Sequence, residues 1–265
     1  MQVSVISNFF GPEEQSLPRL AELGYRRIEV MRKEQVALDA GELRTLAERC
    51  GLELHSVMCW HPGLADEPGE RQAQAWRGLV DNIHWCADLG AKVLEVVPMW
   101  KGEPDQRDQA WSRAVEALGR GGELAGERGV TLAIEPVNRW ETHLVNTLAE
   151  GARMAAEVGL DSVRVMGDTH HMHIGERDLR AAVWAAAPYL VHFHFSDNDR
   201  QVPGLGQMDL PGLVNTLARV GYTGSLSLSE VSRRPDPELA ASLGLRYTQA
   251  LIAVAKVRAE LLGAS

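Results

Sequence analysis

Short apolar runs alternate with longer amphipathic stretches along the whole chain, and eight such pairs can be counted. This alternation is typical of successive βα units that build a parallel sheet. The predicted strands are 3–7, 25–31, 52–60, 92–100, 130–137, 163–168, 190–196 and 225–231, and the predicted helices include 41–50, 71–89, 106–128, 147–158, 179–186, 210–220 and 238–262. Eight units of roughly 30 residues make a (β/α)₈ barrel. We therefore expect an α/β protein with a single TIM-barrel catalytic domain over residues 1–265.

Glycines mark the boundaries between predicted helices and strands. The glycines that follow a helical stretch and precede a strand are Gly51, Gly90, Gly129, Gly159 and Gly221. A left-handed residue commonly closes a helix at such a place. A second glycine-rich run, 119–129, lies inside or at the end of a helix rather than on a strand-to-helix turn. We interpret it as a loosely wound, poorly packed helix end and not as a phosphate-binding loop.

Composition narrows the classes of partner. Lys and Arg total 27 against 36 Asp and Glu, a formal charge of −9, which works against a DNA or anionic-membrane surface. No apolar stretch reaches the about 18 residues of a transmembrane helix, and no basic region precedes the first apolar residues as in a secretory signal. The three cysteines have no CxxC spacing, which argues against a disulfide framework or a zinc knuckle. We expect a soluble, cytoplasmic protein with a small-molecule partner, and neither a nucleic acid nor a membrane.

Metal-ligating side chains recur at the ends of the last four predicted strands. They are Glu135, Asp168, His194 and Glu230, spaced by about one βα unit, or roughly 30 residues. The carboxyl ends of barrel strands meet at one rim, so these groups should converge. Alone, each would be read as a helix cap, a solvated loop group or a core histidine. Together, three carboxylates and one imidazole predict one divalent cation, with Mn²⁺ or Mg²⁺ favoured and Zn²⁺ or Co²⁺ still open.

Strand alternation and further polar groups support a site at the same rim. His192 and His194 share one face of their strand, and Leu226, Leu228 and Glu230 share one face of theirs. Other polar residues expected at the rim are Arg139, Glu141, His171 and Arg200. Trp60, Trp100 and Trp140 fall near the ends of the third, fourth and fifth strands, where they would either stack on a sugar as a pocket wall or fill the barrel mouth.

These motifs resemble those of a known family. The runs EPVNRWETHLVNT, GDTHHMHI, HFHFSDNDRQVPGLGQMD and SEV are similar to the xylose isomerase-like TIM barrels (sugar phosphate isomerases/epimerases), and within them to the D-tagatose and D-psicose (ketose) 3-epimerases. The resemblance implies that Glu135, Asp168, His194 and Glu230 hold the metal, and that Glu141, His171 and Arg200 bind substrate oxygens. Gln207 and Gly175 stand where many of these epimerases have histidine and glutamate, so the substrate itself stays open.

The activity expected from this resemblance is C3 epimerisation of a free ketose. Glu135 and Glu230 would act on opposite faces of an enediolate, so that one removes a proton and the other returns one. A shuttle on one face would instead give 1,2 aldose–ketose isomerisation. An inosose dehydratase or a keto-inositol isomerase is the main alternative, because elimination also starts with enolisation. The substrate would be a small sugar or polyol, and a homodimer or a homotetramer is compatible with the fold.

Two further classes were weighed against the residues. A DNA-repair apurinic endonuclease shares this barrel but holds three metals, and the strand VLEVVPMW supplies no histidine for them. The segment PGLGQMDL also lacks the Asp-x-His pair that such a nuclease needs. A non-catalytic sugar-binding protein would not require two opposed carboxylates on a metal. The sequence therefore favours a metal-dependent isomerase.

Overall fold

The computed structural model describes residues 1–32, 38–60, 62–229 and 231–261. Its strands all pair in parallel, each with the next along the chain and the last with the first, so the sheet closes into an eight-stranded barrel. The strands are β1 (Gln2–Ile6), β2 (Arg27–Met31), β3 (Glu53–Met58), β4 (Val93–Val96), β5 (Thr131–Ile134), β6 (Val163–Asp168), β7 (Leu190–His194) and β8 (Ser225–Leu228). The predicted α/β barrel is confirmed, with a strand in each of the eight expected places.

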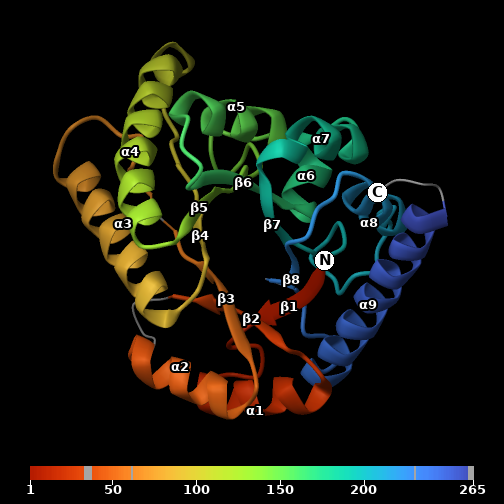
Figure 1. The fold of residues 1–265 in the computed structure, drawn as a ribbon. Helices are drawn as coiled ribbons and strands as arrows, with labels where there is room; N and C mark the ends of the chain where they lie inside the picture. The colour runs from red at the N-terminus through yellow and green to blue at the C-terminus, as the bar shows by residue number, and fades with distance from the viewer. Residues whose placement is uncertain (33–37, 61, 230, 262–265) are drawn as a thin grey trace.

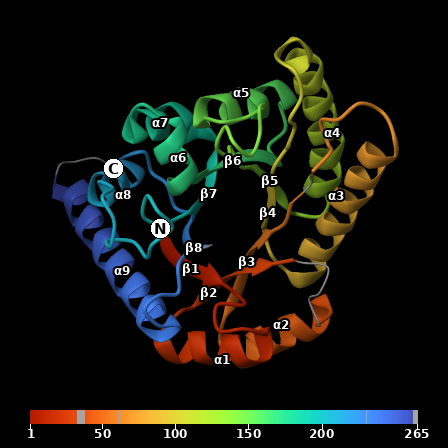
Figure 2. The same ribbon diagram turned by 180° about the vertical axis from the view of Figure 1, so that it is seen from behind.

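Helices surround the barrel in both Figure 1 and Figure 2. The α-helices are α1 (Glu13–Leu23), α2 (Ala40–Arg49), α3 (Glu70–Leu89), α4 (Arg107–Glu127), α5 (Leu148–Val158), α6 (Thr169–Gly175), α7 (Leu179–Ala186), α8 (Leu210–Arg219) and α9 (Pro237–Leu261), with 3₁₀ turns η1 (Pro104–Gln106) and η2 (Ala187–Tyr189). No residue range was predicted from the sequence for α1 or α6. Pro18 interrupts the helical pattern of α1, and α6 begins directly at the end of β6.

The glycines that were predicted to end helices all adopt positive φ, between +66° and +83°. The interpretation of the run 119–129 as a loose helix end is wrong. Helix α4 is continuous to Glu127, and Gly122 is buried in its last turns. A Cβ added at Gly122 would lie 2.5 Å from the Val163 side chain, so this glycine lets the helix approach β6 closely. Gly122 therefore serves the packing of helix against barrel.

Strand register decides which side chains enter the barrel. Asp168 pairs with His194, and His194 pairs with Ser227, so these three side chains share the inner face. His192 and His194 do share that face, as predicted. On β8, however, the inner residues are Ser225 and Ser227. Leu226 and Leu228 point outward, and Leu228 packs beneath Gly244 of α9.

The barrel interior is unusually polar for a packed core. Buried polar or charged residues on the strands include Ser4, Glu29, Ser56, Glu95, Asp168, His192, His194, Ser225 and Ser227. The apolar core lies mainly between the outer face of the barrel and the helices. It includes the strand residues Val5, Ile28 and Phe193, which are fully buried. No helix among the described residues is long and apolar enough to span a membrane.

Candidate functional site

Three of the four predicted metal ligands lie together at the carboxyl ends of their strands. Glu135 follows β5, Asp168 ends β6 and His194 ends β7, and all three are buried. Nδ1 of His194 lies 3.3 Å from Oε1 of Glu135 and 3.4 Å from Oδ2 of Asp168. The fourth predicted ligand and second predicted catalytic glutamate, Glu230, lies outside the described residues.

Arg200 connects Asp168 to His171 at the same rim. Its Nη1 donates to Oδ2 of Asp168 at 2.6 Å, and its Nη2 lies 3.2 Å from Nε2 of His171. Asp168 also caps α6, since its Oδ1 accepts the backbone N–H groups of His170 and His171. Burial raises the pKa of Asp168, but Arg200 and the neighbouring histidines outweigh burial and hold that pKa well below its usual range. Asp168 is therefore an anion that is already oriented.

Glu141 reaches the site through the loop after β5. The side-chain amide of Asn138 donates to Oε1 of Glu141 at 2.6 Å and lies 3.0 Å from Nδ1 of His171. Nδ1 of His171 is 3.9 Å from the same Glu141 oxygen. Asn138, which the sequence did not single out, thus holds Glu141 and His171 side by side. The predicted substrate-binding residues Glu141, His171 and Arg200 all border the Asp168 carboxylate or its immediate neighbours.

The three tryptophans near the rim differ in exposure. Trp60 is 49% and Trp140 is 68% exposed, whereas Trp100 is 7% exposed and belongs to the hydrophobic core. Trp100 packs edge-on against His143, with ring centroids 6.4 Å apart. Only Trp60 and Trp140 among these three offer a free aromatic face.

Two buried glutamates that the sequence analysis missed lie beside His194. Glu29 of β2 and Glu95 of β4 place a carboxylate oxygen 3.2 Å and 3.5 Å from its Nε2. Burial raises the pKa of Glu29, but His194 and His192 lower it to well below the usual value. For Glu95, burial and the nearby Glu135 both raise the pKa well above the usual value. The signal was available: each glutamate interrupts an apolar strand, in RRIEV and in VLEVV.

The chemistry of the cluster fits a divalent cation. Ligand atoms of Glu135, Asp168 and His171 lie within 4.8 Å of one another, and the same holds for Glu95, Glu135 and His194. Neither oxygen of Glu95 nor Nε2 of His194 makes a hydrogen bond with the described residues. Buried polar groups without partners are costly, and a cation would offset that cost. An oxygen-rich set with imidazole suits Mn²⁺ or Mg²⁺.

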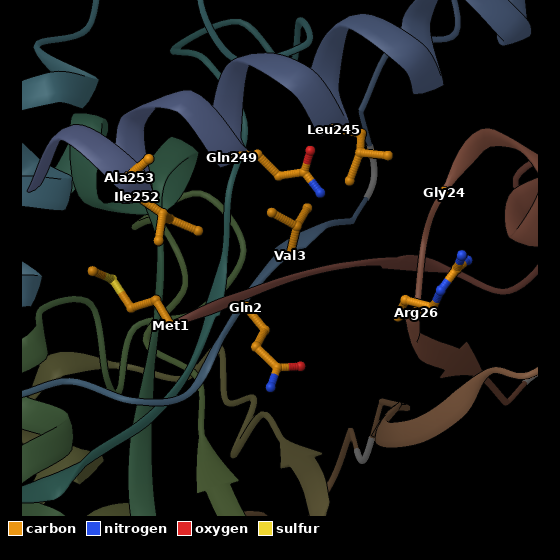
Figure 3. A pocket seen from close by; sticks show the side chains of 9 residues that line it. All are labelled: Met1, Gln2, Val3, Gly24, Arg26, Leu245, Gln249, Ile252 and Ala253. Carbon is orange, nitrogen blue, oxygen red and sulfur yellow. The ribbon is translucent and has the colours of Figure 1, made fainter. Parts of the chain in front are cut away.

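A separate hollow of about 300 Å³ lies at the opposite end of the barrel (Figure 3). It is bounded by the start of β1, the turn before β2 and one side of α9, with Gln2, Arg26 and Gln249 as its polar side chains. Arg26 donates to the backbone carbonyls of Ala21 and Tyr25. Catalytic groups of such barrels come from the carboxyl ends of the strands, so this hollow is not the candidate site.

Comparison with known proteins agrees with the barrel fold. The profile of the xylose isomerase-like TIM barrel family matches residues 17–251. An L-ribulose 3-epimerase of Mesorhizobium japonicum is 33% identical over 83% of this chain and 75% of its own length. A 3-dehydro-D-guloside 4-epimerase of Escherichia coli is 26% identical over 89% of this chain and 95% of its own. A solved structure of an L-ribulose 3-epimerase superposes with a TM-score of 0.89 at 25% identity, covering 99% of this chain and 98% of that one. The chain belongs to the xylose isomerase-like TIM barrel family.

Proposed function

We propose that this protein is a divalent-metal-dependent epimerase that inverts C3 of a free ketose. The observation that carries the proposal is the buried group of Glu135, Asp168 and His194 at the barrel rim, with Arg200 and His171 beside it. Relatives that cover most of the chain are sugar epimerases, which supports the same class of reaction. Glu135, Asp168, His194 and Glu230 are proposed as the ligands, and Mn²⁺ as the metal. When bound, the cation supplies Lewis-acid polarisation of the substrate carbonyl.

The protein's own groups would divide the remaining tasks. Glu135 is proposed to take the C3 proton from one face of the substrate, and Glu230 to return a proton to the other face. Arg200 and His171 would donate hydrogen bonds to the oxygens on which negative charge develops in the enediolate. Glu141, held by Asn138, would accept a hydrogen bond from a substrate hydroxyl. Arg200 is already paired with Asp168, and Asn138 with Glu141, so these side chains need little reorganisation when the substrate binds.

Hydrogen exchange with solvent tests this proposal. The Mn²⁺-loaded protein is incubated in D₂O with a panel of ketohexoses and ketopentoses, and deuterium is located by NMR. We expect deuterium at C3 together with the C3 epimer for at least one sugar. If no ketose exchanges at C3, the proposal is wrong. Loss of water, seen by mass spectrometry, would point to the dehydratase alternative.

A Glu230→Gln variant tests the paired glutamates in the same assay. Because general acid–base catalysis typically contributes 10²–10⁴-fold, we expect turnover to fall by at least about 100-fold. Far-ultraviolet circular dichroism checks that the variant folds. Full turnover of Glu230→Gln would remove this residue from the chemistry.

The 4-epimerase relative gives a specific reason to examine a second position. A 3-dehydro sugar carries its carbonyl one carbon further along, so the same proton transfers would act at C4. Including a 3-dehydro glycoside in the D₂O panel distinguishes proton transfer at C4 of such a sugar from proton transfer at C3 of a ketose. Exchange at C4 of that compound alone would move the proposal from the ketoses to 3-dehydro sugars.

A further inference from the structure

Glu29 is a fully buried carboxylate that three donors hold inside the barrel. Oε1 accepts from Oγ of Ser56 at 3.0 Å and lies 2.8 Å from Nε2 of His192. Oε2 accepts from Oγ of Ser227 at 2.7 Å. The donors come from β3, β7 and β8, so a residue of β2 is fixed from three other strands. An ionised carboxylate in the barrel interior is thereby largely satisfied.

Glu29 also lies beside His194. Oε2 of Glu29 lies 3.2 Å from Nε2 of the His194 ring, an ion-pair distance without the alignment of a hydrogen bond. The other nitrogen of the same ring, Nδ1, faces Glu135 and Asp168. The imidazole therefore lies between the rim carboxylates on one side and Glu29 on the other.

We propose that Glu29 is the positioning residue for His194. With the proposed metal bound, the Glu29 carboxylate would keep a proton on Nε2 and leave Nδ1 free to bind the ion beside Glu135 and Asp168. This inference rests on the proposed function only in requiring that His194 binds the metal. A carboxylate behind a metal-binding imidazole fixes the ring and raises its basicity, and loss of such a group typically weakens metal affinity 10–100-fold.

Glu95 is the other carboxylate near Nε2 and is the competing choice. Its Oε2 is farther away, at 3.5 Å, and neither of its oxygens is hydrogen-bonded to a described residue. A side chain without such anchors cannot define the direction of its neighbour as well as one with three. The geometry thus assigns the positioning role to Glu29 rather than to Glu95.

Calorimetric titration of the metal-stripped, full-length protein with Mn²⁺ tests the assignment. We expect Glu29→Gln to raise the dissociation constant by about 10–100-fold. Ser227→Ala, which removes one of the three donors to Glu29, should raise it by a smaller factor. Ser4→Ala is the matched control. Ser4 pairs with Ser227 in the neighbouring strand and is equally buried, and its hydroxyl makes no hydrogen bond with a described residue. Its loss should leave the dissociation constant unchanged.

Thermal unfolding of the metal-free variants separates positioning from a purely structural role. The inference is overturned if Glu29→Gln lowers stability but binds Mn²⁺ like wild type, or if Glu95→Gln weakens binding more than Glu29→Gln does. If Glu29→Gln fails to fold, the comparison of Ser227→Ala with Ser4→Ala decides, and equal affinities overturn the inference. If all variants bind Mn²⁺ with the wild-type affinity, the inference is overturned and the proposed function stands. Absence of Mn²⁺ binding by the wild type overturns both.

Discussion

Each ring nitrogen of His194 faces two buried carboxylates. Nδ1 faces Glu135 and Asp168, and Nε2 faces Glu29 and Glu95. Burial lowers the pKa of His194, but Glu29 and the rim carboxylates raise it well above the ordinary value. Several buried charges surround this one imidazole. Such an arrangement is expected of a functional residue and not of one that only fills the core.

His55 gives the clearest dependence of stability on pH. Burial, His192 and Arg27 lower its pKa to about 4, outweighing the opposite effects of Glu53 and Glu29. Its ordinary value is 6.5. Between these pH values the unfolded chain binds more protons than the folded one, so the free energy of unfolding falls as the pH falls. Stability from neutral His55 is complete above pH 6.5 and is lost toward pH 4.

We therefore expect His55→Gln to flatten the pH dependence of unfolding. In urea titrations of the metal-free protein, the slope between pH 6 and 5 should decrease by about 1.2 kcal/mol per pH unit, slightly less than the value for one full proton. His173→Gln, which changes an exposed histidine of α6, is the control and should keep the wild-type slope. An unchanged slope in His55→Gln would contradict the neutral state of this partly buried histidine.

At the scale of elements, two glycines of α4 have opposite structural roles. Gly119 has open space around its Cα, whereas a Cβ at Gly122 would meet Val163 at 2.5 Å and Leu160 at 3.0 Å. The sequence cannot distinguish them, because both lie in one glycine-rich run. The packing of α4 against β6 does distinguish them.

Alanine at these two positions should therefore shift stability in opposite directions. Gly119→Ala should raise the free energy of unfolding by about 0.5–1 kcal/mol, since alanine loses less backbone entropy in a helix. Gly122→Ala should lower it by about 1–3 kcal/mol through overpacking. Urea unfolding midpoints at equal m-values measure both changes. Equal shifts of the same sign would show that α4 does not pack as described.

At the scale of the whole molecule, closure of the barrel is what concentrates buried acids at one place. Glu29 and His192 are 163 positions apart in the chain and 2.8 Å apart in space. Negative charges gathered in this way repel one another unless a cation or a donor compensates them. Binding of the proposed metal should therefore be linked to the stability of the entire fold.

Mn²⁺ is expected to stabilise the folded protein by mass action. At a free concentration 100 times the dissociation constant, the gain is about 2.7 kcal/mol, which raises Tm by roughly 5–10 °C for a chain of this size. Differential scanning calorimetry with Mn²⁺ and with a chelator measures the change. Asp168→Asn, which removes a proposed ligand, should lose most of the increase. A Tm that does not respond to Mn²⁺ in the wild type would contradict the proposed metal site.

The sequence alone determined the barrel and the grouping of its rim residues. Hydrophobic period and glycine position depend on local chain geometry, so all eight strands could be predicted. The spacing of Glu135, Asp168 and His194 by whole βα units indicated a shared rim, and the structure brings these three together.

Tertiary structure decided what lies beneath the rim. The predicted common face of Leu226 and Leu228 points away from the barrel interior, and Leu228 packs against α9. Strand register, not the apolar pattern, determines which side of β8 points inward. Glu29 and Glu95 could be seen as charges within apolar runs, but their contact with His194 depends on closing the sheet. Local propensity determines which residues form strands. Only the pairing of those strands determines which charges meet.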